Sequence, residues 1–367
     1  MKMIQLTYSL LAGGAERVVV GLSNRLAANE ENEVVLVSVL DDAVPRNTFY
    51  LKDLSPRVRY INLHCKRGLE PKAIWRVFQT IRKERPDVVH SHVSVVLLLL
   101  PTLFMRQVCY FHTIHNMPKR IADGAGVVKR AIKYYMFKRK KVKPITLSEA
   151  CSRSYRETYH VCNDICIMNG SEPLAVTEEK PSVEREVEML KHHPDDIVFI
   201  HVARHHPQKN HGRLFRTFLR LEKEGERFIL MVLGEHYDSC KTELKESKNI
   251  FLLGAKKNVG DYLSVADFFV LSSDYEGLPM TLLEATSMGV IPVSTPAGGV
   301  VDVIEDGVNG YLAESFDDED FYRKIKQAMS ERGKIPSERI KQQYEKHFSM
   351  ETCAENYYEA YKQAVKG

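Results

Sequence analysis

The chain has 367 residues, of which 44% are hydrophobic and 27% are charged, and its formal net charge at pH 7 is +4. This length suits two domains that each bury a core, and the composition is that of a soluble globular protein. A net charge this small does not indicate nucleic-acid binding, so any basic surface for a partner has to be local.

The chain begins with an apolar stretch that a signal peptide would share, because Lys2 precedes it and small residues end it. Polar residues such as Gln5 and Thr7 interrupt the stretch, so we predict a first strand followed by a glycine turn instead. Gly13 and Gly14 form that turn. Glycines there let the backbone approach a ligand closely, and the start of the next helix favours a phosphate.

Short apolar or β-branched runs alternate with helical periodicity, which is typical of βαβ units and mainly parallel sheets. The predicted strands of the first half are Ile4–Tyr8, Val34–Val39, Val58–Leu63, Val88–Ser91, Val108–Ile114, Ile145–Leu147 and Ile165–Met168. The residues from Pro71 to Glu84 predict a crossover helix. The longest apolar run, from Val93 to Met105, contains Pro101 and is too short to cross a bilayer.

A basic segment extends from Val127 to Lys143 and contains eight lysines or arginines. Its apolar residues fall on one helical face, namely Val128, Ile132, Tyr135 and Met136. A helix of this kind can rest on an anionic membrane surface. The candidate membrane contacts are Lys138, Arg139, Lys140 and Lys141. A solvated crossover helix whose apolar stripe packs on the sheet explains the same pattern, so both interpretations stay open.

The alternation lapses between Ser171 and Asp196, where a charged and proline-punctuated stretch predicts a domain boundary that includes a short helix from Val183 to Leu190. We therefore predict an N-terminal Rossmann-like domain over residues 1–170 and a C-terminal one over residues 171–344. The second series of predicted strands is Ile197–Val202, Phe228–Leu233, Ile250–Leu253, Phe268–Leu271 and Val290–Val293. Two such α/β halves with mainly parallel sheets imply a central ligand cleft, because these sheets bind at the carboxyl ends of their strands.

Two cations follow the first strand of the second half, in the stretch HVARHHPQKNH. Arg204 and Lys209 could stabilise negative charge that develops on a leaving group in a closed site. The simpler interpretation is that both are solvated loop charges. We interpret the neighbouring His205, His206 and His211 as loop polarity, because no ligand spacing indicates a metal site.

The stretch DYEGLPMTLLEATSMGV, from Asp274 to Val290, follows a predicted buried strand and runs into a helix. Gly277, Leu278 and Pro279 form a tight turn there, and we predict that the helix starts near Met280 or Thr281. Its free N–H groups and its dipole make a phosphate site. Glu276 precedes the turn and Glu284 lies on what we predict to be the first helical turn. Both glutamates could therefore reach one ligand, although two solvated surface charges would give the same spacing.

At this point the sequence resembles the retaining GT-B glycosyltransferases of the glycosyltransferase family 4 or group 1 type, which carry a Glu-x7-Glu motif. The resemblance implies that Glu276 lies against the donor sugar, that Glu284 binds the ribose hydroxyls and that Arg204 and Lys209 neutralise the donor diphosphate. It covers nearly the whole chain. Further matching stretches are GGAERVV, PDVVHSH, TIHN, TLSEA, MNGSE and TPAGGVVDVIEDGVNGYL.

The resemblance also implies a histidine beside the donor sugar. His115, in TIHN, matches that histidine, and His112 is the rival candidate three residues earlier. Asp302 departs from the pattern, because relatives have glutamate there. The family also leads us to expect that a C-terminal helix, about 345–367, packs back on the first domain through a stripe of apolar residues. That stripe is Ala354, Tyr357, Tyr358, Tyr361 and Val365.

The expected activity is transfer of a sugar, with retention, from a UDP- or GDP-sugar to a saccharide or lipid-linked saccharide, in the synthesis of bacterial cell-surface polysaccharide or lipopolysaccharide. No metal or other cofactor and no nucleic acid is expected. The seven scattered cysteines favour a reducing compartment, so we expect a cytoplasmic protein, free or peripheral on the inner face of the cell membrane. The alternatives are a sugar-nucleotide epimerase or phosphorylase of the same fold, and a non-catalytic sugar-nucleotide-binding protein.

Overall fold

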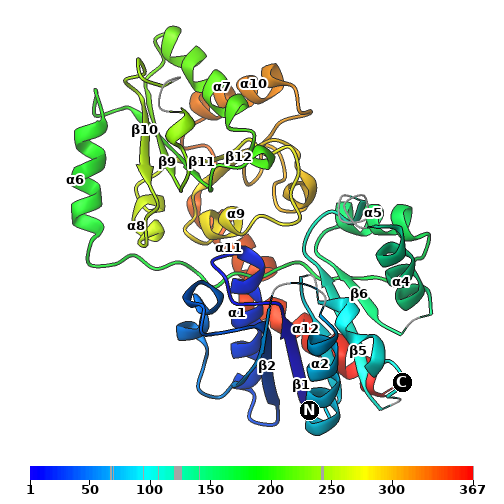
Figure 1. Cartoon of the computed structure of the whole chain (residues 1–367). Helices are drawn as coiled ribbons and strands as arrows, with labels where there is room; N and C mark the ends of the chain where they lie inside the picture. The colour runs from blue at the N-terminus through cyan, green and yellow to red at the C-terminus, as the bar shows by residue number, and fades with distance from the viewer. Residues whose placement is uncertain are drawn as a thin grey trace. The chain divides into compact units, whose positions relative to one another are not determined.

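The computed structural model describes residues 1–66, 68, 70–93, 95–105, 107–119, 126–139, 141–240 and 244–366. The chain divides into two compact units (Figure 1). Unit 1 comprises Met1–Ser171 together with His347–Gly367, and unit 2 comprises Glu172–Lys346. The change of unit at Ser171 falls one residue after the boundary predicted from the lapse in periodicity, and α/β folds of this kind were expected for both halves.

Unit 1 is built on a parallel seven-stranded sheet in the order β3-β2-β1-β4-β5-β6-β7. Its strands are β1 (Lys2–Thr7), β2 (Glu33–Leu40), β3 (Arg59–Cys65), β4 (Val88–Ser91), β5 (Cys109–Ile114), β6 (Lys143–Thr146) and β7 (Ile165–Cys166). Its α-helices are α1 (Gly14–Ala28), α2 (Pro71–Glu84), α4 (Val127–Lys138), α5 (Glu149–Tyr159) and α12 (Met350–Lys366). Short 3-10 helices are η1 (Pro45–Thr48), η2 (Leu51–Asp53) and η3 (Val96–Thr102).

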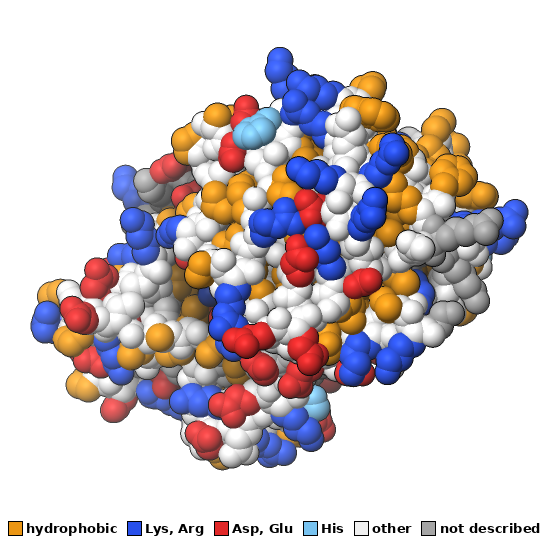
Figure 2. All heavy atoms as spheres, turned by 90° about the horizontal axis from the view of Figure 1, so that it is seen from below, with side chains coloured by type: hydrophobic (Ala, Val, Ile, Leu, Met, Phe, Trp, Pro, Cys, Tyr) orange, Lys and Arg blue, Asp and Glu red, His pale blue; other side chains and the backbone are white. Residues whose placement is uncertain are grey.

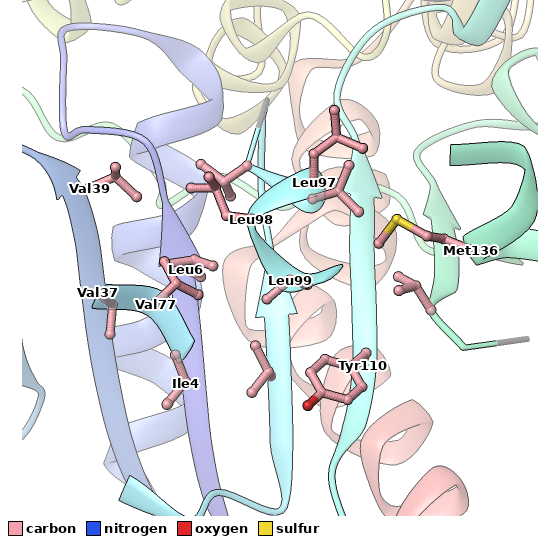
Figure 3. Close-up of a cluster of buried hydrophobic side chains, with 14 of the residues drawn as sticks. Ile4, Leu6, Val37, Val39, Val77, Leu97, Leu98, Leu99, Tyr110 and Met136 are labelled. Atoms are coloured by element: carbon pink, nitrogen blue, oxygen red, sulfur yellow. The ribbon is translucent and has the colours of Figure 1, made fainter. Parts of the chain in front are cut away.

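Both faces of this sheet are covered, which explains why an inner strand such as β2, EVVLVSVL, is almost continuously apolar rather than alternating. On one face, residues of β1 and β2 such as Leu6 and Val37 pack with Val77 of α2, Leu98 of η3 and Met136 of α4 (Figure 3). The other face packs against α1 and α12.

The C-terminal helix α12 belongs to unit 1, although it follows unit 2 in the sequence. Its Tyr357 and Tyr361 are fully buried, whereas Val365, which the predicted stripe included, is 44% exposed. The chain returns at a bridge between Ser171 and Ser349. Gly170 permits this approach, because a Cβ atom there would lie 2.5 Å from the Ser349 carbonyl oxygen.

Unit 2 has a parallel six-stranded sheet in the order β10-β9-β8-β11-β12-β13. Its strands are β8 (Ile197–Val202), β9 (Phe228–Leu233), β10 (Ile250–Gly254), β11 (Phe268–Leu271), β12 (Ile291–Ser294) and β13 (Tyr311–Leu312). Its helices are α6 (Lys180–Leu190), α7 (His211–Lys223), α8 (Val259–Leu263), α9 (Met280–Ser287), α10 (Asp318–Ser330) and α11 (Ser337–Phe348), with 3-10 helices η4 (Pro207–Lys209), η5 (Asp238–Cys240) and η6 (Gly298–Asp302). Every strand predicted from the sequence exists, and β13 was missed because two residues show no periodicity.

The basic segment forms a helix that is shorter than the segment itself. Helix α4 ends at Lys138, Arg139 caps it and Lys141 lies beyond it, while Lys140 falls outside the described residues. Met136 and Phe137 are buried, but Val128 and Tyr135 are 72% and 55% exposed, so the predicted apolar stripe does not pack on the sheet as a whole. The inward face is decided by the Phe137 ring, which makes edge contacts with Tyr155 and Tyr159 of α5.

Within the described part of the chain, no helix combines the length and the apolar composition needed to cross a bilayer.

Candidate functional site

The loop after β11 is anchored before it reaches Glu276. Arg213 of α7 is only 5% exposed, and its Nη1 donates to the Ser272 carbonyl oxygen and to Asp274 Oδ1, each at 2.9 Å. Its Nε donates to Asp318 Oδ1 at 3.1 Å, which ties the loop to the start of α10. Moving this buried guanidinium would break several hydrogen bonds and leave a buried charge unpaired, which lowers the free energy of unfolding. Arg213 therefore fixes the path of the chain toward Glu276.

The Glu276 carboxylate is 5% exposed and is held by three donors. Lys209 Nζ and Ser273 Oγ donate to its Oε1, each at 2.7 Å, and Gln208 Nε2 donates to its Oε2 at 3.1 Å. Gln208 also donates to the Tyr275 carbonyl oxygen at 2.8 Å. The carboxylate is therefore buried, paired with an ammonium group and fixed in direction, which is the condition in which a carboxylate acts on a ligand without reorganising.

A glycine-rich loop closes against the turn that follows Glu276. Gly298 has φ +57°, and a Cβ atom there would lie 1.9 Å from the Glu276 carbonyl oxygen. The next N–H, from Gly299, donates to the Gly277 carbonyl oxygen at 2.9 Å. Only glycine fits this position, which gives the TPAGG stretch a structural reason. Asp302 ends η6, the short helix that this loop begins.

Helix α9 starts at Met280, as predicted, with Pro279 as its N-cap and no side-chain cap. Gly277, Leu278 and Pro279 are buried, so the turn is packed rather than solvated. Glu284 is 7% exposed and is the fifth residue of the helix, which corrects the prediction that it lies on the first turn. The uncapped N–H groups at the start of α9 are the kind that bind an anion.

The two predicted cations differ in their surroundings. Arg204 is exposed, and its side chain makes no hydrogen bond or ion pair with any residue that the structure describes. Lys209 lies in η4, is 18% exposed and forms the ion pair with Glu276. Gly234 packs directly against the backbone before Arg204. Glycine is needed there, because a Cβ atom would lie 1.8 Å from the Ala203 carbonyl oxygen.

His211 is not loop polarity, as the sequence suggested, because it is 4% exposed in a buried network. Its Nε2 lies 2.8 Å from the Tyr237 hydroxyl and 3.2 Å from His201 Nε2. Burial lowers the pKa of His211 to about 2 and that of His201 to about 4, so both are neutral at pH 7. Because Tyr237 donates to the Ala203 carbonyl oxygen at 2.7 Å, this network supports the segment before Arg204.

In unit 1 the predicted glycine turn lies at the start of α1. Gly13 is the N-cap, with an extended backbone, and Gly14 is the first helical residue. No side chain caps this helix. A Cβ atom on Gly13 would lie 2.3 Å from Glu16 Oε2, so glycine leaves room for that carboxylate.

The two histidine candidates lie at the carboxyl end of β5 and line one pocket of unit 1. Burial lowers the pKa of His112 to about 3 and that of His115 to about 4. His112 is 4% exposed, whereas His115 is half-buried, with its Nε2 3.3 Å from His92 Nδ1. Both histidines are therefore neutral at pH 7, and His115 is the more accessible of the two.

The sequence analysis missed Gln208, Ser273 and Arg213. Gln208 of η4 and Ser273 are polar residues that no spacing rule singles out, and they gain a role only because the fold places them around Glu276. Arg213 lies three residues after the α7 cap Asn210, and its sequence position gives no sign that it is buried.

Two family models match the chain. Residues 182–347 match the model of the glycosyl transferases group 1, and residues 12–169 match that of Glycosyltransferase Family 4. The chain is a glycosyltransferase of the family 4 and group 1 type. Each model covers most of one unit, so the assignment rests on both halves of the molecule.

Curated relatives agree with this assignment. The chain is 24% identical over 321 residues to the UDP-Gal:alpha-D-GlcNAc-diphosphoundecaprenol alpha-1,3-galactosyltransferase of Escherichia coli, covering 79% of this chain and 76% of that protein. It is 23% identical over 336 residues to the amylovoran biosynthesis glycosyltransferase AmsD of Erwinia amylovora, covering 87% of each.

Solved structures share the fold along the whole chain. Anabaena Alr3699/HepE in complex with UDP and glucose matches with a TM-score of 0.79 at 16% identity, covering 99% of this chain and 100% of that one. The lipopolysaccharide outer core galactosyltransferase WaaB matches with a TM-score of 0.75 at 17% identity, covering 99% of each. The glycosyltransferase therefore has the GT-B fold of two Rossmann-like domains with parallel sheets.

Proposed function

We propose that this glycosyltransferase transfers a sugar, with retention, from a nucleoside-diphosphate sugar to a saccharide or lipid-linked saccharide of a bacterial cell-surface polysaccharide or lipopolysaccharide. The observation that carries the proposal is the buried Glu276 carboxylate, which three donors hold beside the uncapped start of α9. The donors and acceptors named for the relatives support the substrate classes.

The bond that breaks joins the anomeric carbon to the donor diphosphate, and the charge that develops on that diphosphate needs fixed positive partners. Arg204, Lys209 and the N–H groups at the start of α9 supply them. Glu284 accepts hydrogen bonds from the ribose hydroxyls, and Glu276 lies against the sugar. Such an arrangement requires no metal or other cofactor for charge neutralisation.

Retention is explained by attack from the front side. The acceptor hydroxyl forms the new bond to the anomeric carbon on the face that the diphosphate leaves, and its proton passes to the leaving diphosphate oxygen. Glu276 is unsuited to act as a covalent nucleophile, because its Oε1 already accepts from Lys209 and Ser273. Its fixed negative charge instead stabilises the positive charge that develops at the anomeric carbon.

A thermal-shift panel of UDP, GDP and ADP tests donor binding first, because a ligand at about 100 times its Kd adds about 2.7 kcal/mol to the free energy of unfolding. Hydrolysis of the matching nucleotide sugar by the purified protein then tests turnover. Binding without hydrolysis or transfer would favour a non-catalytic sugar-nucleotide-binding protein. Isomerised donor without transfer would indicate an epimerase, and phosphate-dependent cleavage a phosphorylase.

The surface of unit 1 favours a peripheral membrane site on the cytoplasmic face as a second element of this proposal. Helix α4 exposes Val127 at 85% and Val128 at 72%, and it contains no acidic residue. Helix α2 packs with η3 on the same face of the sheet and exposes Trp75 at 57%. Figure 2 shows Lys and Arg side chains interspersed with hydrophobic patches, together with Asp and Glu side chains. Exposed apolar residues among cations suit an anionic lipid surface.

Co-sedimentation with vesicles that contain phosphatidylglycerol tests this attachment. Replacing Lys138, Arg139, Lys140 and Lys141 by glutamine should release the protein while leaving donor hydrolysis unchanged, because each cation near the surface contributes about 1 kcal/mol. Attachment should also weaken as salt increases. Failure of the unmodified protein to co-sediment at low salt would show that the basic segment is an ordinary solvated surface.

A further inference from the structure

Arg204 combines a fixed backbone with an exposed side chain. The N–H of Ala203 donates to the Leu233 carbonyl oxygen at 3.0 Å. The N–H of His205 donates to the Glu235 carbonyl oxygen at 2.9 Å, so the residues on both sides of Arg204 are held. The Arg204 side chain pairs with no residue that the structure describes. Because even paired surface charges contribute little to the free energy of unfolding, stability does not explain why this segment is held so firmly.

A buried tyrosine holds the carbonyl group directly before Arg204. Tyr237, in the loop after β9, is 5% exposed, and its hydroxyl donates to the Ala203 carbonyl oxygen at 2.7 Å. Burial raises the pKa of Tyr237, so the hydroxyl keeps its proton. Gly234 packs against the same carbonyl oxygen, and His236 turns the chain with a left-handed backbone at φ +68°. Residues other than glycine adopt that backbone uncommonly, and such strain is concentrated at functional sites.

The Tyr237 hydroxyl also accepts a hydrogen bond, from His211 of α7. Because Tyr237 gives its only proton to Ala203, its oxygen accepts at 2.8 Å from His211 Nε2, which must therefore carry a proton. Burial lowers the pKa of His211 to about 2, so the ring is neutral and its Nδ1 is bare. Both side chains are buried, so solvent does not compete for these bonds.

His201 of β8 fixes the proton of His211 from the other side. Nδ1 of His201 lies 2.8 Å from the Val270 carbonyl oxygen, which can only accept, so Nδ1 carries the proton. Burial lowers the pKa of His201 to about 4, so the ring is neutral and Nε2 is bare. That bare nitrogen lies 3.2 Å from His211 Nε2 and accepts from it. If Tyr237 donated to His211 instead, two bare nitrogens would face each other and Ala203 would lose this donor.

Every hydrogen bond of this network therefore has a single consistent direction. Its groups come from β8, β11, α7 and the loop after β9, which are separate in the sequence. Burying polar groups costs free energy that apolar side chains of similar size would not. A fully satisfied buried network makes its surroundings rigid instead. The last bond of the network ends at Ala203, so the rigidity acts on the residue before Arg204.

We propose that Tyr237 is the positioning residue of Arg204: it fixes the backbone from which the guanidinium reaches the donor diphosphate, and the two histidines hold the Tyr237 hydroxyl in place. The role of Arg204 in neutralising that diphosphate rests on the proposed function. The network acts on turnover, because charge on the diphosphate grows toward the transition state and a displaced guanidinium stabilises that charge less. All of these residues belong to unit 2.

The proton positions are measurable without any ligand. In the full-length protein labelled with ¹⁵N in histidine, long-range ¹H–¹⁵N correlation distinguishes protonated from bare ring nitrogens, and substitution of each histidine assigns the signals. We expect a proton on Nδ1 of His201 and on Nε2 of His211 at pH 7. A bare Nε2 on His211, or a proton on Nε2 of His201, would overturn the proposal, because Tyr237 would then not be held in the direction of Ala203.

Removing the Tyr237 hydroxyl tests the positioning role. Hydrolysis is measured with whichever of UDP-glucose, UDP-galactose and GDP-mannose the enzyme uses fastest. Tyr237→Phe should lower kcat about tenfold with little change in donor KM, because a small displacement near the reacting groups costs turnover. His211→Phe keeps Tyr237 but removes the donor to its hydroxyl, so it should lower kcat in the same way and replaces Tyr237→Phe if that variant does not fold.

Tyr322→Phe is the matched control. It removes another tyrosine hydroxyl of unit 2, which donates to Glu224 just beyond the opposite end of α7 from His211. This variant should keep a normal kcat, and thermal unfolding should show that both tyrosine variants are folded. Equal losses of kcat in Tyr237→Phe and Tyr322→Phe would overturn the proposal, because they would show a merely structural effect.

A double-mutant cycle shows whether the effect passes through Arg204. If Tyr237 acts by positioning Arg204, Tyr237→Phe should change kcat by less than about twofold once Arg204→Ala is present, because residues that act together are not additive. The same loss in both backgrounds would overturn the proposal. Failure of the proposed function would look different: Arg204→Ala alone would leave kcat normal, with the proton positions of the two histidines intact.

Discussion

The two units share a doubly wound parallel sheet but differ in the candidate ligand groups at the carboxyl ends of their strands. Unit 2 presents charges, with the buried carboxylate of Glu276 held by Lys209 and the buried guanidinium of Arg213 held by Asp274. Unit 1 presents neutral imidazoles, because burial lowers the pKa of His112 and His115 well below 7. Each unit has a ligand-binding location at the carboxyl ends of its strands, and the side chains there decide which chemistry it supports.

In the proposed function the charged groups of unit 2 serve the diphosphate of the nucleotide sugar. A diphosphate leaving group needs fixed positive charge, which a buried site can hold only if each charge is paired.

Ending the chain at Tyr344 should destroy unit 1 and give insoluble protein. The truncation removes α12, whose Tyr357 and Tyr361 are fully buried against the sheet and whose hydroxyls bond to Thr113 and His90. The core of unit 2 contains no residue of α12, so the loss falls on one unit. Solubility and circular dichroism measure the effect. A truncated protein that stays folded and active would show that α12 is an appendage.

Arg204→Ala and Lys209→Ala should each lower kcat on the order of 10²-fold, with a smaller change in donor KM, because the charge on the diphosphate grows toward the transition state. The two variants should differ in stability. Lys209→Ala also leaves Glu276 buried without its cation, which costs about 3 kcal/mol or more, whereas Arg204 has no ion pair among the described residues.

Steady-state kinetics and urea unfolding separate these two effects. Normal kcat with a raised KM in both variants would mean that the cations bind substrate and transition state equally. Equal stability of the two variants would contradict the ion pair between Lys209 and Glu276.

The periodicity of the sequence was sufficient to predict the sheets, because strands buried on both faces are continuous apolar runs. The start of α9 near Met280 could also be predicted, since Gly277 and Pro279 indicate a turn before it. The networks could not be predicted from pattern. His115 is oriented by Gln5, His92 and Tyr361, which are far apart in the sequence and meet only after α12 returns to unit 1.

Which face of helix α4 is buried could not be predicted from the sequence pattern either. Helical periodicity put Val128 and Tyr135 on one face with Met136 and left open whether that face packs on the sheet. In the structure the Phe137 ring packs against α5, and Val128 and Tyr135 are exposed. Tertiary packing decided between two faces of similar hydrophobicity.

Acid should weaken the protein in a defined pH window. In the folded state the pKa of His115 and that of His201 are about 4, below the usual 6.5. Between these two pH values the histidines of the unfolded chain bind protons, whereas those of the folded chain stay neutral. The free energy of unfolding should therefore fall as pH decreases from about 6.5 to about 4, by at most about 1.4 kcal/mol per pH unit for each such histidine.

Carboxylates change the free energy of unfolding over a separate, lower pH range. The guanidinium of Arg59 and the ammonium of Lys2 lower the pKa of Glu84 to about 2, so its contribution is lost only below about pH 4.5. Urea unfolding at pH 7, 6, 5 and 4 measures the first window. The variant His115→Gln should reduce the slope, and an unchanged free energy of unfolding between pH 7 and 4 would contradict the neutral histidines.

The most direct test of the account is titration calorimetry of the preferred nucleoside diphosphate into three proteins: the wild type, Glu284→Ala and His115→Ala. If unit 2 binds the nucleotide through Glu284, the first variant should bind about 1 to 3 kcal/mol more weakly, because the ribose hydroxyls lose their acceptor in a desolvated site. His115→Ala should bind as tightly as the wild type, because the bare nucleotide carries no sugar to transfer. Unchanged affinity in Glu284→Ala, or a loss in His115→Ala alone, would contradict the assignment of the nucleotide to Glu284.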